Sequence, residues 1–437
     1  MQVSVSATSG LERRLEVAVP ATEIAAEVEQ RLKQISRTAR LKGFRPGKAP
    51  FAVVKKQFGD QVHSEVVSDV MRTSFARAID QEKLQPAAGP RIEPIAMQPG
   101  ADLKYAAVFE VLPEITVKPV DTLTLERPVS SVTEADLDAM IESMRRQRPV
   151  FTPVERAARD TDRVTLDFDG LIDGKPFEGG EGRDVAVVVG TRQAMPELEE
   201  GIKGASPGET RQVTLAFPAD HPKKNLAGQT AHLQVTVKRV EEQSLPAIDE
   251  DFCKAYGVEE GGVEALRAEV RKSMERELEG VIRTRLRTQV MDGLYSNNPL
   301  DLPRALIDEQ VQQLAIDMAR RIGARDASQL PPRAQFEEPA RRRVALGLLM
   351  GKIVQNESLK ADRDRVQERL GDLIASYPNP EEARKAYLQN PDAMKQVESS
   401  VLEEQVVDWV IERARVTDKP MSFKDLTGFG QNEAAAG

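Results

Sequence analysis

A single stripe of apolar residues most strongly limits what this chain of 437 residues can fold into. Between residues 266 and 294 every fourth position is apolar, in the order Leu266, Val270, Met274, Leu278, Ile282, Leu286, Val290 and Leu294. With about 3.6 residues per turn, this spacing forms one continuous stripe that winds slowly around an α-helix. A stripe of this length predicts a helix of roughly 30 residues, about 45 Å long. We therefore expect an elongated helical region rather than a compact bundle.

Further helical patterns cover residues 307–322, 344–354, 366–377 and 397–411. Their apolar residues are almost entirely aliphatic, because Phe336 is the only phenylalanine between Phe252 and Phe423. Such long, charged helices cannot bury all their apolar area in one core. Two interpretations stay open: an elongated scaffold, or aliphatic surface left exposed for a partner.

Residues 164–240 follow a different pattern. Val164, Leu166 and Phe168 alternate with polar residues, and residues 211–217 and 230–237 alternate in the same way. Asp173-Gly174 between two such runs is typical of a tight hairpin turn. The segment predicts a compact antiparallel sheet with a short helix at residues 196–201.

The first 112 residues combine both patterns. They predict a hairpin over residues 2–19 and a helix that begins at Thr22 and ends at Gly43. Two more helices follow, through residues 53–58 and 66–75, and then a strand at 103–111. Beyond Pro113 we expect a strand-like connector and a short helix through Leu137 and Ile141.

The fold class predicted is therefore a multi-domain α+β chain. Residues 1–112 form an N-terminal α+β domain, 113–149 a connector, 150–243 an antiparallel-sheet domain, 244–428 an elongated all-α domain, and 429–437 a disordered tail.

Charge is unevenly distributed. The net charge of −9 argues against a general nucleic-acid binder. Nevertheless residues 31–56 contain nine basic residues and no acidic one. The run is either a solvated helix face or a site for a local anionic partner, and the absence of acids favours the partner.

Several kinds of site and location are excluded. One cysteine, Cys253, permits no disulfide framework, and three scattered histidines suggest no metal site. No Gly-x-x-x-x-Gly-Lys-Ser/Thr loop is present, so we expect no nucleotide cofactor. The start of the chain lacks a secretory signal, and the longest apolar stretch, near residues 344–354, is too short to span a membrane. We expect a cytoplasmic protein that needs no cofactor.

The loop at residues 43–50 reads Gly-Phe-Arg-Pro-Gly-Lys-Ala-Pro and resembles the ribosome-docking signature of the trigger factor family. The resemblance implies that Phe44, Arg45 and Lys48 bind the large ribosomal subunit at the tunnel exit. Physically, Phe44 offers an apolar anchor, whereas Arg45 and Lys48 can meet carboxylates or rRNA phosphates. The alternative is an ordinary polar turn.

The sheet segment resembles an FKBP-type peptidyl-prolyl isomerase, through residues 168–178, 185–190 and 196–201 in the expected order. The resemblance implies a pocket, with no nucleophile, that favours the twisted amide. Its lining residues are Phe168, Phe177, Met195, Leu198, His221 and Leu233; core packing is the alternative for each. Leu198, His221 and Leu233 replace the usual aromatic residues, which predicts a modest isomerase.

A third match begins the helical part. Residues 245–252 read Leu-Pro-Ala-Ile-Asp-Glu-Asp-Phe and resemble the family's entry into its helical domain, so the resemblance covers essentially the whole chain. It implies an ATP-independent chaperone that shields nascent and unfolded polypeptides, and a possible homodimer when free of ribosomes. The rivals are a dedicated prolyl isomerase with targeting domains, a non-enzymatic adaptor that binds a few defined partners, and a periplasmic chaperone, which the missing signal disfavours.

Overall fold

The computed structural model describes residues 1–39, 41, 44, 48–98, 100–191, 193–218, 226–324, 326 and 329–430. Over this part the chain is a multi-domain α+β protein with antiparallel sheets and a helical C-terminal region, which confirms the predicted fold class. It packs as two compact units, each built from two segments: Met1–Arg127 with Thr284–Lys419, and Pro128–Arg283 with Pro420–Gly437.

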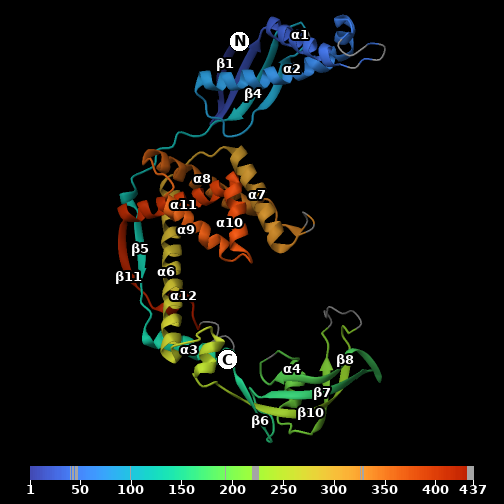
Figure 1. Ribbon diagram of the computed structural model, residues 1–437, viewed down its shortest axis with the longest axis vertical. Helices are drawn as coiled ribbons and strands as arrows, with labels where there is room; N and C mark the ends of the chain where they lie inside the picture. Colours follow the sequence, from blue (N-terminus) through green and yellow to red (C-terminus); the bar gives the residue numbers. More distant parts are fainter. Residues whose placement is uncertain are drawn as a thin grey trace. The chain divides into compact units, whose positions relative to one another are not determined.

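The first unit begins with an antiparallel sheet in the order β1-β2-β4-β3, against which two helices pack (Figure 1). Its elements are β1 (Gln2–Ser9), β2 (Glu12–Val19), α1 (Ala21–Thr38), α2 (Phe51–Glu82), β3 (Arg91–Ala96) and β4 (Leu103–Glu110). Tyr105 of β4 is fully buried, and its hydroxyl lies 2.8 Å from Ser74 Oγ and donates to the Met71 carbonyl. This pair of bonds ties the sheet to α2.

The first helix begins one residue before the position expected. Thr22 is not its cap: α1 starts at Ala21 after Pro20, and the Ala21 N–H donates to Asp102 Oδ1 at 2.9 Å. A carboxylate from far along the chain thus satisfies an N–H that a local cap would otherwise take. The helix ends at Thr38, short of Gly43, which lies outside the described residues.

The two helices expected after this loop are one. Helix α2 runs without a break from Phe51 to Glu82, through Gly59. A glycine inside a helix costs only about 1 kcal/mol. Val54, Val62 and Val66 on its inner face are buried in the core of the sheet, which compensates for that cost.

The helical part of the first unit contains several small cores rather than one. It comprises η1 (Val120–Thr122), β5 (Thr124–Val129), α7 (Arg304–Ile322), α8 (Ala334–Asn356), α9 (Arg363–Ile374), α10 (Pro380–Gln389), α11 (Pro391–Arg413), β11 (Arg415–Pro420) and the end of α6 (Gly262–Asn297). Helices α7 and α8 share one buried cluster, and α9, α10 and α11 share another. Large apolar side chains nevertheless stay about half exposed: Ile316 (46%), Ile322 (52%), Tyr377 (47%) and Leu388 (53%).

The long apolar stripe lies on one helix, as predicted. Helix α6 spans Gly262–Asn297, and all eight stripe residues are buried or half-buried. The elements that escaped prediction include β3, α10 and β11, the last of which pairs with β5.

The second unit holds α3 (Glu134–Gln147), α5 (Glu250–Ala255) and α12 (Phe423–Thr427) around the first part of α6. The Thr133 side chain and Asp136 form a reciprocal capping box at the start of α3. The expected disordered tail starts too early at residue 429, because the Phe429 ring packs 6.2 Å from that of Phe423. Residues 431–437 lie outside the described residues.

The same unit contains the predicted antiparallel sheet, which we call the sheet module: β6 (Val150–Val154), β7 (Arg163–Ile172), β8 (Lys175–Val188), α4 (Pro196–Ile202), β9 (Thr210–Ala216) and β10 (Thr230–Ser244). Strand β10 pairs with β6, β7 and β9, and β7 pairs with β8. Asp173 and Gly174 join β7 to β8 with φ of 50° and 77°, as the expected tight turn requires.

Candidate functional site

The sheet module brings five of the six predicted pocket residues into one apolar cluster. Leu198 and Leu233 are buried in it, and Phe168, Phe177 and Met195 pack against it half-buried. His221, the sixth, lies outside the described residues. The rings of Phe168 and Phe177 are only partly buried, whereas Leu233 is 3% exposed and serves mainly as core.

Glycines determine where the Phe177 ring lies. A Cβ atom on Gly180 would come within 2.7 Å of Phe177 Cε1, and one on Gly170 within 3.1 Å of the same atom and 3.3 Å of Leu233 Cδ1. The ring therefore packs over two bare backbones beside Leu233. The centroid of the Phe217 ring lies 6.1 Å from that of Phe177 with an interplanar angle of 83°, an edge-to-face pair.

The helix α4 carries Leu198 and begins after Met195. Glu199, only 6% exposed, reaches back from this helix: its carboxylate accepts from the Gly190 N–H (2.9 Å) and the Ala194 N–H (3.1 Å). A buried carboxylate is costly unless such donors satisfy it. Glu199 thus holds in place the loop that leads from β8 to Met195.

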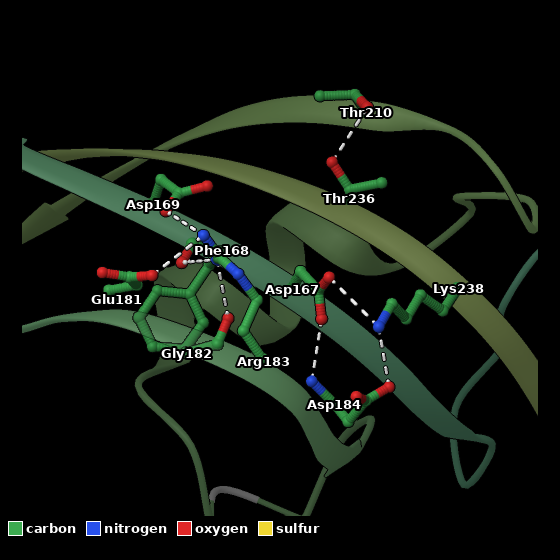
Figure 2. Close-up of polar contacts among 10 residues, drawn as sticks. All are labelled: Asp167, Phe168, Asp169, Glu181, Gly182, Arg183, Asp184, Thr210, Thr236 and Lys238. Carbon is green, nitrogen blue, oxygen red and sulfur yellow. Dashed lines mark hydrogen bonds and ion pairs between the residues drawn. The ribbon is translucent and has the colours of Figure 1, made fainter.

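Phe168 lies at a β-bulge. In the β7–β8 ladder Leu166 pairs with Val185 and Phe168 with Gly182, so Asp167 alone faces both Arg183 and Asp184. Asp184 has a φ of 52°, and its N–H donates to Asp167 Oδ1 at 2.8 Å instead of to the ladder. Figure 2 shows this bulge with the ring of Phe168 beside Gly182. Bulges often change the direction of a side chain next to an active site.

The charges around the bulge stabilise it. Lys238 on β10 contacts Asp184 (2.8 Å) and Asp167 (3.2 Å). The pKa of Asp167 lies below its ordinary value, first because the Asp184 N–H donates to it and also because Lys238 is close. Asp167 therefore stays ionised at neutral pH, and both of these contacts persist.

Near the start of the chain the second predicted site is only partly described. Phe44 is 41% exposed, Lys48 is exposed, and Arg45 lies outside the described residues. Of the six described members of the basic run, Arg31 pairs with Asp69 and Lys33 with Glu29. The other four make no ion pair with any described residue: Arg37, Lys48, Lys55 and Lys56.

A cavity of about 780 Å³ lies beside this run, between α1, α2 and the turn before β4. Apolar side chains line much of it, among them Val28, Phe51 and Met97, with Lys55 and Glu29 also in its wall. Phe51 and Met97 are more than a third exposed. The N-terminal domain thus presents apolar surface next to basic surface.

Sequence reasoning missed Phe217, Glu199 and Arg183. Phe217 ends an alternating run that was recognised, so the ring on its inner face was in principle predictable. Glu199 and Arg183 could not be identified, because burial of a carboxylate and a bulge depend on pairing between distant segments. In the part of the chain that the structure describes, no group of three metal-ligating side chains occurs, and no helix is both long and apolar enough to cross a membrane.

Comparison with known proteins covers the whole chain. Residues 1–144 match the family model of the bacterial trigger factor protein, residues 262–412 that of its C-terminus, and residues 154–238 that of FKBP-type peptidyl-prolyl cis-trans isomerase. The trigger factor of Halorhodospira halophila is 44% identical over 439 residues, with 100% of both chains covered. That of Marinobacter nauticus is 41% identical over 431 residues, with 99% of both chains covered.

A solved structure supports the same fold. It belongs to work on promiscuous substrate recognition in folding and assembly by the trigger factor chaperone, and it aligns with a TM-score of 0.55 at 16% identity. The alignment covers 94% of this chain and 99% of that chain. With full-length relatives above 40% identity and matching models at both ends and in the sheet module, this chain belongs to the trigger factor family of chaperones and carries an FKBP-type peptidyl-prolyl isomerase domain.

Proposed function

We propose that this chaperone works on the ribosome without ATP, docking through its N-terminal domain and shielding new polypeptide with its helical region. The observation that carries the proposal is the basic segment at residues 31–56, which contains no acidic residue and includes the exposed Phe44. The segment lies in the region that matches the family's N-terminal model. Such a segment on an acidic protein suits an anionic partner.

The proposed partner is the large ribosomal subunit at the tunnel exit, through a ribosomal protein and rRNA phosphates. Phe44 would fill an apolar recess, while Arg45 and Lys48 meet the anionic groups. The test is co-sedimentation of the full chain with ribosomes across a salt series. Retention at low salt and progressive loss at high salt support phosphate contacts. No ribosome binding at low salt would reject the docking proposal.

Support for client shielding comes from the helices. Ile316, Ile322 and Leu388 leave about half of their surface exposed although each lies on or beside a helix with its own small core. Scattered, open aliphatic surface suits unfolded chains in general rather than a few defined partners. This favours a chaperone over an adaptor.

Removal of the sheet module should leave client protection intact. Val150 and Ser244 are paired residues at the two ends of the module, so a short linker can replace residues 151–243 with little strain. We expect the shortened chain to suppress aggregation of an unfolded client within about twofold of the full chain, because the exposed helical surface lies elsewhere. Light scattering of a diluted, denatured client measures this. A folded deletion variant that protects no client would place the holding surface in the module and favour the rival prolyl isomerase.

For the isomerase domain we propose that Phe168, Phe177, Met195, Leu198, His221 and Leu233 line the pocket. Phe217 is added to this set because it packs edge-on against Phe177. The pocket works by excluding water and favouring the twisted amide over the planar one. With Leu198 in place of an aromatic floor, activity on short peptides should be modest.

Leu198→Trp is expected to raise isomerisation of a short proline peptide more than refolding of a proline-limited protein. The added ring gives the proline a flat surface, and each ~1.4 kcal/mol of added transition-state stabilisation is tenfold in rate. In a protein client the helical surface already concentrates the chain near the pocket. Both rates are measured in wild type and variant, and circular dichroism checks the fold. If the variant folds but slows both reactions, Leu198 packs a core and lines no site.

We further propose the domain limits 1–112, 113–149, 150–243 and 244–428, a cytoplasmic location beside translating ribosomes, and a homodimer as the ribosome-free state. The location suits a chain whose single cysteine, Cys253, is buried and unpaired. Sedimentation velocity over a concentration series tests the dimer.

A further inference from the structure

We propose that Arg183 is a positioning residue for the isomerase: its guanidinium fixes the backbone that carries Phe168 and so sets the wall of the pocket. The proposal rests on the proposed placement of Phe168 in that pocket. Arg183 matches no motif in the sequence, and it is the bulge in β8 that directs its side chain towards β7.

The contacts of Arg183 form a clamp across the two strands. Nη1 donates to the carbonyl oxygens of Phe168 and Gly182, both at 3.1 Å, and these two residues are the paired residues that border the bulge. Nη2 contacts Asp169 at 2.7 Å and Glu181 at 3.0 Å. The Arg183 guanidinium thus connects β7 and β8 at Phe168 (Figure 2). Only arginine has a fork of donors suited to this geometry.

Close packing makes the ring sensitive to this clamp. A Cβ atom on Gly182 would lie 2.3 Å from Phe168 Cε1, so the ring rests directly on the Gly182 backbone. If the clamp is released, the ladder on either side of the bulge can shift, and Phe168 and Gly182 move relative to each other. Small displacements of a pocket wall lower the rate of reaction more than they weaken binding of the planar substrate.

The clamp also has a defined charge. Arg183 is 48% exposed, and Asp169 and Glu181 flank it. The pKa of Arg183 lies above its ordinary value, first because its guanidinium donates a hydrogen bond to Asp169. The guanidinium is therefore always charged and its charge is balanced locally, so its role is to hold the backbone rather than to bind an anionic substrate.

The test is a double-mutant cycle in the full chain, with isomerisation of a short proline peptide as the activity. Arg183→Ala should lower kcat about tenfold and leave KM within about twofold. Arg183→Lys should recover only part of the loss, because an ammonium cannot reach both carbonyls and both carboxylates. In a Phe168→Leu background Arg183→Ala should have almost no further effect, since the ring that it positions is gone.

Arg211→Ala is the matched control. Arg211 also makes a clamp, to Glu209 and to the carbonyls of Gly201, Lys203 and Gly204, but it contacts the far end of α4 and not Phe168. Arg211→Ala should lower thermal stability about as much as Arg183→Ala does. It should leave kcat per folded molecule nearly unchanged.

Two results would overturn the proposal. If Arg183→Ala keeps the wild-type kcat, Arg183 has no positioning role. If Arg183→Ala lowers kcat equally with and without the Phe168→Leu substitution, Arg183 is only a general stabiliser. Should Phe168→Leu itself leave the rate unchanged, the proposed pocket fails and the clamp fails with it. If Arg183→Ala does not fold, Arg183→Gln takes its place in the cycle, because its amide can still donate to one carbonyl.

Discussion

Arg156→Ala is expected to cause the largest loss of stability that we predict for a single side chain outside the apolar cores, and to destabilise the sheet module. The Asp162 side chain is only 2% exposed, and Arg156 contacts both of its oxygens, at 2.5 and 3.0 Å. Arg156 also bonds Glu242 at 3.0 Å. Without Arg156 a buried carboxylate keeps only the N–H of Arg159 as a described donor.

Hydrogen exchange over β7 and β10 in the full chain measures this loss, because it reports the opening of one module. The loss should speed exchange from globally opened states about a hundredfold. Arg156→Ala combined with Asp162→Asn should recover part of the stability, since no unpaired charge is then buried. Lys203→Ala, which breaks an exposed pair with Asp160, is the control and should change exchange only slightly. Equal hydrogen exchange in wild type and all variants would contradict a stabilising role for the Arg156–Asp162 pair.

The same pair gives the module a dependence on acid. Burial raises the pKa of Asp162, but the hydrogen bonds from Arg156 and Arg159 outweigh it, so the folded pKa lies below the ordinary value. A depressed carboxyl pKa contributes stability that is full above the unfolded pKa of about 3.9 and is lost as pH falls through the folded value. In wild type this contribution should therefore be constant near neutrality and shrink below about pH 4, which hydrogen exchange of the wild-type chain over an acid series measures.

Elements governed by local patterns were predictable. The stripe on α6 and the Asp173-Gly174 turn depend on spacing and on turn chemistry, both of which are visible in a short window. Elements governed by distant pairing were not. Strand β11 exists because it pairs with β5 from a much earlier part of the chain, and the short run Arg415–Pro420 shows no alternation of its own.

The candidate site shows the same division. Phe168 and Phe177 could be named because their segment resembles FKBP-type isomerases. Their positions depend on groups that the sequence does not single out: the buried carboxylate of Glu199 and the bulge that turns Arg183 towards Phe168. At the start of α1 a distant side chain again overrode a local signal, since Asp102 bonds the first N–H and Thr22 caps nothing.

Replacing Phe44, Arg45 and Lys48 together with alanine should reduce ribosome affinity by about thirtyfold or more. Central anchors of an interface commonly cost at least about 2 kcal/mol when truncated. Loss of two cations should also flatten the salt dependence of what binding remains. Phe44 is well exposed, and neither Phe44 nor Lys48 lies in a helix or strand, so the circular dichroism spectrum should not change.

The control for this variant makes the same change in net charge at another place in the domain. Arg72 and Arg77 lie on α2 in the same domain, both more than 70% exposed, and outside the acid-free segment. The double variant Arg72→Ala, Arg77→Ala removes two positive charges, as many as the triple variant does. It should bind ribosomes within about twofold of wild type if the loop, rather than overall charge, carries docking.

The most direct test of ribosome docking is therefore co-sedimentation of wild type, the triple loop variant and the Arg72/Arg77 variant with purified ribosomes at one fixed, moderate salt concentration. The account predicts that wild type and the Arg72/Arg77 variant pellet with the ribosomes while the folded triple variant stays in the supernatant. A triple variant that pellets as wild type does would contradict docking through residues 43–50.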